Sequence, residues 1–167
     1  MGLLTFKGGI HPNDGKSLAK DKAIVEVLPE GDLVFPLSQH IGAPAAPIVK
    51  VGDQVLKGQK IAEAGGFVSA PVYSSVSGKV KAIAPYFTPT GGKVSSIIVE
   101  NDGAYTEAER LSTRPLEMLS KEEILNLIAE AGIVGMGGAG FPTRVKLSPK
   151  EPEKIEYVIA NCAECEP

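Results

Sequence analysis

The sequence predicts an α+β chain in which an all-β domain precedes the beginning of an α/β domain. Between Leu33 and about Asn101, short apolar stretches alternate with Gly, Pro and Asp turns, and no useful helical period occurs. After this region come one amphipathic helix, a glycine-rich loop and an apolar segment. The predicted divisions are an arm (1–32), a β domain (33–103), a linker (104–119) and an incomplete α/β region (120–167).

The composition is typical of a globular protein and argues against nucleic-acid binding. Hydrophobic residues make up 43% and charged residues 22% of the 167 residues. The net charge is −3, and the basic residues are scattered instead of forming a stripe. No apolar stretch is long enough to span a bilayer, and the first residues lack the apolar core of a signal peptide. These features predict a soluble, cytoplasmic protein.

The clearest pattern in the β domain lies between Val49 and Ile61. Gly52-Asp53 and Lys57-Gly58 mark two turns, and we expect the valines and isoleucine of this segment to pack inward. Shorter motifs follow at residues 69–72 and 77–80. Over about residues 43–100 this order resembles the barrel-sandwich hybrid fold of biotinyl and lipoyl carrier domains.

The resemblance to carrier domains does not extend to the attachment lysine. In a carrier the modified lysine would lie at a hairpin tip, near Glu63 to Gly66 in this sequence. No lysine occurs between Lys60 and Lys79. The β domain is therefore expected to be a scaffold or a docking module.

One helix is predicted after the β domain. Ser120 is a good N-cap, and Glu123 three residues later completes a capping box. Gly132 is a natural C-terminal stop. Between them an apolar stripe at helical spacing is formed by Ile124, Leu127, Ile128 and Ala131.

A glycine loop follows this helix, with four glycines in six residues: Gly135, Gly137, Gly138 and Gly140. Glycine lets the backbone approach a ligand closely, and consecutive N–H groups ahead of a helix bind phosphate. Lys146 can add a positive charge, and Phe141 can stack on a flat ring. The loop fits neither the Rossmann nor the Walker pattern, and a flexible connection is the alternative.

A second polar cluster lies at residues 161–167, after a predicted strand over Glu156–Asn161. Open α/β sheets hold their ligands at such strand ends. Cys162 and Cys165 form a single Cys-x-x-Cys, which is too few thiolates for a zinc or iron–sulfur site. Lone histidines such as His11 and His40 are expected to be structural hydrogen-bonding groups.

The two polar motifs together resemble a known family. Gly-x-Gly-Gly-Ala-Gly-Phe-Pro-Thr-x-x-Lys followed by Asn-x-x-Glu-x-Glu-Pro is similar to the signature of the flavin-bearing, NADH-oxidising subunit of respiratory complex I. With the β domain and the segments 6–12 and 36–44, essentially all 167 residues resemble the C subunit of the Rnf complex, an ion-translocating ferredoxin:NAD oxidoreductase. A cobalamin reductase of the same architecture is the competing resemblance.

The resemblance implies a role for each matching residue, with no catalytic residue and no metal ligand. Lys146 would bind the FMN phosphate and Phe141 would contact NAD(H). Met136 and Ala163 stand where the complex I protein has arginine and aspartate. The glycines that would face FMN are Gly135, Gly137, Gly138 and Gly140, and the residues at the flavin and nucleotide end of the strand would be Asn161, Glu164 and Glu166.

The resemblance also implies electron transfer between NAD(H), FMN and iron–sulfur clusters, coupled to ion translocation. The [4Fe-4S] clusters are expected in a later segment, so this part of the protein is expected to be inactive alone. Implied partners are the membrane subunits of the complex, NAD(H) and, indirectly, ferredoxin, with the protein peripheral on the inner face of the cell membrane. The alternative from another class is a non-catalytic docking module.

We predict that neither biotin nor lipoate becomes attached to this chain, because no lysine lies between Ile61 and Gly78. Intact-mass spectrometry after co-expression with biotin and lipoate ligases tests this. A mass increase that matches either group would contradict the scaffold interpretation.

Overall fold

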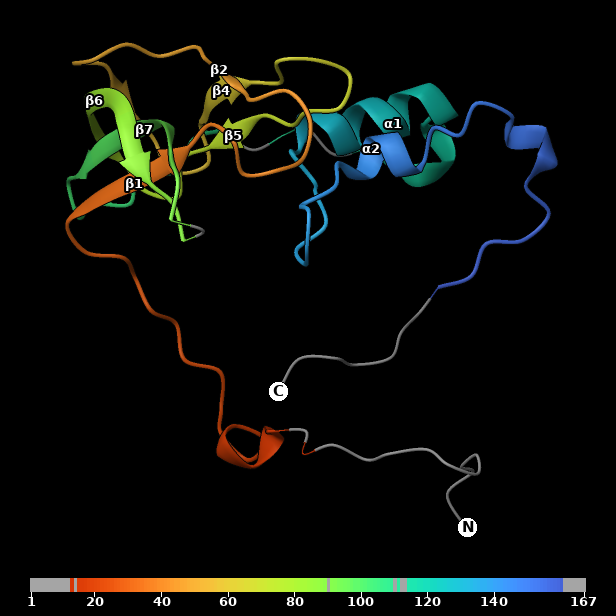
Figure 1. Ribbon diagram of the computed structural model, residues 1–167, viewed down its shortest axis with the longest axis horizontal. Coiled ribbons are helices and arrows are strands. Elements are labelled where there is room, and N and C mark those ends of the chain that lie inside the picture. The colour runs from red at the N-terminus through yellow and green to blue at the C-terminus, as the bar shows by residue number, and fades with distance from the viewer. Residues whose placement is uncertain (1–12, 14, 90, 110, 112–113, 161–167) are drawn as a thin grey trace. The chain divides into compact units, whose positions relative to one another are not determined.

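The structure is a computed structural model that describes residues 13, 15–89, 91–109, 111 and 114–160. The chain forms two compact units, one of residues 29–154 and one that combines residues 1–28 with 155–167. The larger unit contains every strand and the two α-helices among the described residues (Figure 1). It is described first.

Four antiparallel strands form the larger sheet, in the order β1-β7-β6-β3. The long hairpin of β6 and β7 is its centre, and β1 pairs with β7 from Asp32 opposite Glu100 to Pro36 opposite Ser96. Burial alternates at the start of β6, where Gly78 and Val80 are buried and the residues between and after them are exposed, as the period of two in a strand requires. The strands are β1 (Asp32–Pro36), β3 (Gln54–Val55), β6 (Gly78–Phe87) and β7 (Lys93–Asn101).

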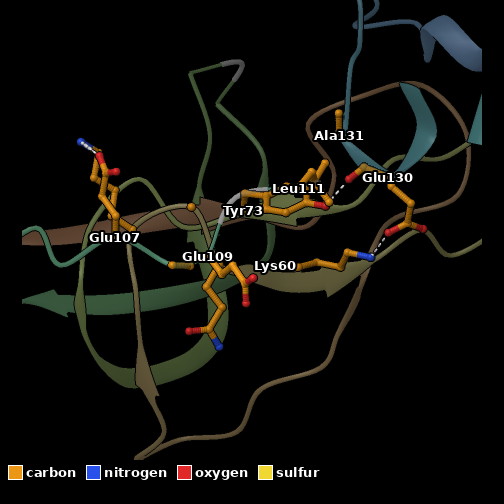
Figure 2. Close-up of a pocket in the computed structure, with 11 residues that line it drawn as sticks. Lys60, Tyr73, Glu107, Glu109, Leu111, Glu130 and Ala131 are labelled. Atoms are coloured by element: carbon orange, nitrogen blue, oxygen red, sulfur yellow. Dashed lines mark hydrogen bonds and ion pairs between the residues drawn. The ribbon is translucent and has the colours of Figure 1, made fainter. Parts of the chain in front are cut away.

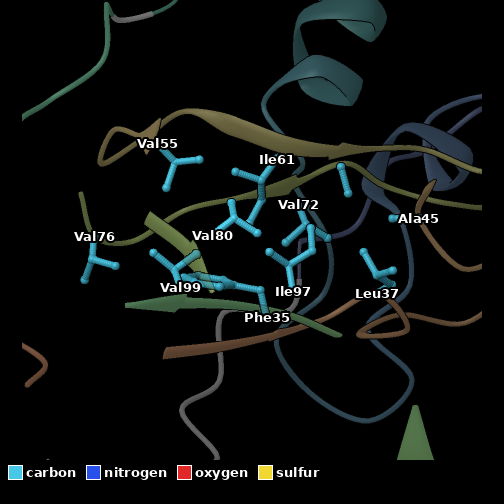
Figure 3. Close-up of a cluster of buried hydrophobic side chains, with 11 residues drawn as sticks. Phe35, Leu37, Ala45, Val55, Ile61, Val72, Val76, Val80, Ile97 and Val99 are labelled. Carbon is cyan, nitrogen blue, oxygen red and sulfur yellow. The ribbon is translucent and has the colours of Figure 1, made fainter. Parts of the chain in front are cut away.

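The smaller sheet has three antiparallel strands in the order β2-β4-β5. These are β2 (Ala46–Pro47), β4 (Lys60–Glu63) and β5 (Val72–Tyr73). Both sheets contribute to one apolar core, in which the largest completely buried side chains include Ile61 and Ile97 (Figure 3). Burying each such side chain stabilises the fold by about 1.5–3 kcal/mol.

Most of the predicted turn pattern between residues 49 and 61 is confirmed. Gly52 and Gly58 have positive φ angles of 97° and 84°. Val55 and Ile61 are buried, as expected. The expectation of inward packing is wrong for Val51, which is 60% exposed, because it lies in the turn that the Asp53 N–H closes on the Lys50 carbonyl.

Residues 104–108 pack against the β domain. The Lys57 N–H donates to the Thr106 carbonyl, and the Ala108 N–H donates to the Lys57 carbonyl. The Tyr105 ring packs on the core while its hydroxyl donates to the Pro29 carbonyl at 2.6 Å. This part of the predicted linker is therefore held in place by the β domain.

Helix α1 (Lys121–Glu130) begins with the predicted capping box. The Glu123 N–H donates to the Ser120 hydroxyl at 3.2 Å, and the Ser120 N–H donates to the Glu123 carboxylate at 2.8 Å. This bond from the Ser120 backbone, helped by Arg114, lowers the pKa of Glu123 to about 2. Gly132, with a φ of 66°, follows the last turn as predicted. The other helices of the larger unit are α2 (Thr143–Lys146) and the 3-10 turns η2 (Leu116–Met118) and η3 (Pro152–Lys154).

The described part of the smaller unit contains no strand. It holds the 3-10 turn η1 (Lys16–Leu18), and its other described residues belong to no helix or strand. The predicted strand over Glu156–Asn161 is wrong for Glu156–Ala160, where Val158 is 92% exposed. A strand needs a neighbour to accept and donate its backbone hydrogen bonds, and no described segment pairs with this one.

The capping box predicts an acid-dependent contribution to stability. Folding lowers the pKa of Glu123 from 4.5 to about 2, so its contribution is complete above pH 4.5 and is lost as the pH falls toward 2. We expect Glu123→Gln to flatten the pH dependence of the unfolding free energy in this window, measured by urea titration at several pH values. Glu122→Gln is the matched control. Equal pH profiles for the two variants would contradict the assignment.

Candidate functional site

The glycine loop is the turn of a short antiparallel hairpin. Val134 pairs with Pro142, and the Gly135 N–H donates to the Phe141 carbonyl at 2.9 Å. On the helix side, the Thr143 N–H donates to the Ile133 carbonyl at 3.0 Å. These bonds fix both ends of the loop. The loop is therefore an ordered turn at the end of a closed hairpin.

The four glycines of the loop have different surroundings. A Cβ at Gly140 would lie 2.8 Å from the Gln39 carbonyl oxygen, and one at Gly135 would lie 3.3 Å from the Lys146 ammonium nitrogen. Gly137 and Gly138 have no atom within 4 Å of such a Cβ. Two glycines therefore allow close packing, and two leave an open backbone surface at the tip.

The open tip presents unused hydrogen-bond donors. The N–H groups of residues 136–139 donate to no other residue that the structure describes. Met136 is 99% exposed at the start of this run. Successive free N–H groups of this kind form an anion-binding surface.

Lys146 and Phe141 lie next to each other beside the hairpin. The Lys146 ammonium nitrogen is 6.0 Å from the centre of the Phe141 ring, and Lys146 makes no ion pair with the described residues. The Lys146 ammonium and the Phe141 backbone both lie near Gly135. Helix α2 has only four residues, so its dipole contributes little, and Lys146 supplies a positive charge beside Gly135.

The β domain supports the glycine loop directly. The Ile41 N–H donates to the Ala139 carbonyl at 2.9 Å, and Gly140 lies against the backbone of Gln39 and His40. No side chain fits between these two backbones, which explains why residue 140 is glycine. The loop is held by the β domain as well as by its own hairpin.

Helix α1 is joined to the smaller sheet through its last turn. Lys60 and the hydroxyl of Tyr73 both donate to Glu130, the first to its carboxylate and the second to its carbonyl (Figure 2). The hydrogen bond with Glu130 raises the pKa of Lys60, and partial burial raises the pKa of Tyr73. These residues line a groove of about 790 Å³.

The described residues contain one of the two predicted polar clusters. The structure brings together Gly135, Phe141 and Lys146, with Gly137 and Gly138 at the open tip. Asn161, Glu164 and Glu166 lie outside the described residues, so their predicted position remains a prediction. Sequence reasoning missed the supporting contacts of Gln39, Ile41 and Tyr73, because they join distant segments and carry no local pattern.

Comparison with known families identifies the chain. Residues 4–104 match the family described as RnfC Barrel sandwich hybrid domain. This chain belongs to the RnfC family. Residues 128–167, which include the glycine loop, match the family described as Nuo51 FMN-binding domain. In this RnfC chain no described helix has both the length and the apolar character needed to cross a membrane.

Curated relatives of this RnfC chain are named as C subunits of ion-translocating complexes. It is 50% identical over 167 residues to the C subunit of the proton-translocating ferredoxin:NAD(+) oxidoreductase complex of Clostridium ljungdahlii, covering 99% of this chain and 36% of that protein. Identity to the Na(+)-translocating counterpart of Acetobacterium woodii is 44% over 166 residues, covering 98% and 37%. It is also 43% identical to the C subunit of the ion-translocating oxidoreductase complex of Rhodobacter capsulatus, covering 98% and 32%. The chain spans roughly a third of the length of these relatives.

We predict that Gly140→Ala destabilises the chain more than Gly138→Ala. Both glycines have a φ of 58°, so both variants bear the strain of a left-handed alanine, about 1–2 kcal/mol. Only at residue 140 does the new methyl group also meet backbone, 2.8 Å from the Gln39 oxygen. Thermal and urea unfolding measure the difference, and equal losses would show that the loop does not pack on the barrel.

Proposed function

We propose that this chain is the N-terminal part of the C subunit of an Rnf-type complex and that its glycine loop holds the phosphate end of FMN. The observation that carries the proposal is the run of N–H groups at residues 136–139 that donate to no described residue, directly after Gly135, where a Cβ would lie 3.3 Å from the Lys146 ammonium nitrogen. A phosphate accepts hydrogen bonds from such N–H groups, and an ammonium group adds a charge-assisted contact. The open surface at Gly137 and Gly138 is the space that a ligand would occupy.

Each residue of the site has a part in this proposal. The free amides and Lys146 bind the phosphate, and the half-buried Phe141 offers an aromatic face toward the nicotinamide nucleotide. Gly135 leaves room for the Lys146 ammonium nitrogen, which would lie only 3.3 Å from a Cβ at this position. Asn161, Glu164 and Glu166, which lie outside the described residues, would complete the flavin and nucleotide end of the site, as the family resemblance implies.

FMN, when bound, supplies hydride acceptance from NADH and one-electron transfer to a further acceptor. The protein residues orient the rings and neutralise the phosphate charge. In the proposed complex, electrons pass between NAD(H), FMN and [4Fe-4S] clusters outside these 167 residues, coupled to ion translocation. The chain would be peripheral on the inner face of the membrane, in contact with other subunits of the complex.

The fold has a part in this proposal as well. We take the β domain to have the biotinyl/lipoyl-like arrangement, used as a scaffold because no lysine lies at its hairpin tip. Residues 120–167 then begin the α/β flavin domain, and the segment that follows Ile155 would become a strand when neighbouring strands pair with it. The match of residues 128–167 to the FMN-binding family supports this arrangement.

Two substitutions in the full-length protein test the proposal. Lys146→Ala removes a charge-assisted contact, and we expect FMN binding to weaken by about 1.5–3 kcal/mol. Gly138→Val places a branched side chain at a φ of 58° on the open surface and should weaken binding by blocking close approach. FMN content after purification and isothermal titration measure both effects.

The matched control for the lysine is Lys150→Ala, an exposed lysine four residues further on. It should bind FMN as the unchanged protein does. Full flavin content in both the Lys146 and Gly138 variants would show that the loop is only a connector. That outcome would favour the docking module.

A further inference from the structure

The segment Gln39–Ala43 of the β domain, here called the brace, lies between the glycine loop and residues 68–70. Toward the glycine loop, the Ile41 N–H donates to the Ala139 carbonyl at 2.9 Å. Toward the barrel, the Ala43 N–H donates to the Val68 carbonyl, also at 2.9 Å. The brace is therefore a direct structural connection from the β domain to the glycine loop.

His40 lies at the centre of the brace and has its ring buried, with 9% of the residue exposed. Its Nε2 atom lies 3.1 Å from the Ala70 amide nitrogen and 3.2 Å from the Ala70 carbonyl oxygen, and its Nδ1 atom lies 3.1 Å from the Ile41 carbonyl oxygen. An amide nitrogen can only donate and a carbonyl can only accept. With its proton on Nδ1, the ring accepts from the Ala70 N–H at Nε2 and donates to the Ile41 carbonyl.

This arrangement connects His40 to the glycine loop through Ile41. The His40 ring holds the Ile41 carbonyl, and the N–H of the same residue holds Ala139. The backbone of His40 is also the surface on which Gly140 packs, with its Cα 3.2 Å from where a Cβ at residue 140 would lie. The His40 ring and backbone therefore lie at the two points where the loop contacts the brace.

We infer that His40 is a positioning residue for the glycine loop: its bond to Ala70 holds the brace where Ile41 and Gly140 can seat the loop. In consequence, the free N–H groups at residues 136–139 keep a fixed direction although His40 touches none of them. The relevance to FMN rests on the function proposed above. The positioning of the glycine loop by His40 does not rest on that function, and it can be measured without FMN.

Two substitutions separate the two ring nitrogens of His40. His40→Gln places an amide oxygen near the Nε2 position and keeps an acceptor for the Ala70 N–H. His40→Asn reaches only the Nδ1 position and loses that bond. By hydrogen exchange followed by NMR, we expect the Ile41 amide to exchange about tenfold faster in His40→Asn and near the original rate in His40→Gln.

Ser96→Ala is the matched control, because Ser96 is fully buried and its hydroxyl also donates to a backbone carbonyl, that of Val94. It should lower overall stability without selective loss of protection at Ile41. Equal Ile41 exchange in the His40→Asn and Ser96→Ala variants would overturn the inference. If His40→Asn does not fold, a tenfold loss of Ile41 protection in His40→Gln would overturn it instead.

FMN titration of the full-length protein with the same substitutions separates this inference from the proposed function. We expect FMN affinity to fall about tenfold in His40→Asn and to be restored in His40→Gln. If the unchanged protein binds no FMN while Ile41 exchange responds as expected, the proposed function fails and the positioning role stands. If FMN binds but Ile41 exchange does not respond, the positioning role fails.

Discussion

The apolar core between the two sheets holds both ends of the loop that runs from Leu37 to Ala45. The position of the candidate site depends on this packing. Leu37 and Ala45 are each 4% exposed, and the Ala45 N–H donates to the Leu37 carbonyl at 2.8 Å. Core burial thus closes the loop at its base. The brace that supports the glycine loop lies between these two residues, so the packing of the barrel determines where the loop is held.

The glycine loop combines two requirements that a sequence motif does not separate. Both Gly138 and Gly140 have a positive φ, which the turn requires, and Gly140 is needed in addition because its backbone meets the backbone of Gln39 and His40. Of these two glycines, only Gly138 has open space in which a ligand could approach the backbone. A glycine-rich motif can therefore be partly structural even where it forms a binding site, and substitutions at different glycines would affect different properties.

The sequence predicts the local features well and the long-range ones poorly. The capping box of Ser120 and Glu123 and the turn at Gly52 are confirmed, because each depends on residues within a few positions. The structural hydrogen-bonding role expected of His40 is confirmed by its contacts, but its partner Ala70 lies 30 residues away and leaves no pattern in the sequence. The predicted strand after Ile155 fails for a related reason, since strand formation depends on a partner outside the segment.

The central claim is that the barrel holds the glycine loop through the Ile41–Ala139 hydrogen bond. The most direct test is the scalar coupling across that bond, between the Ile41 amide nitrogen and the Ala139 carbonyl carbon, measured by NMR on the isotope-labelled chain. Couplings across the β6–β7 hairpin serve as the internal reference. Our account predicts a detectable coupling for the Ile41–Ala139 pair. Its absence, with the β6–β7 couplings clearly seen, would contradict the account.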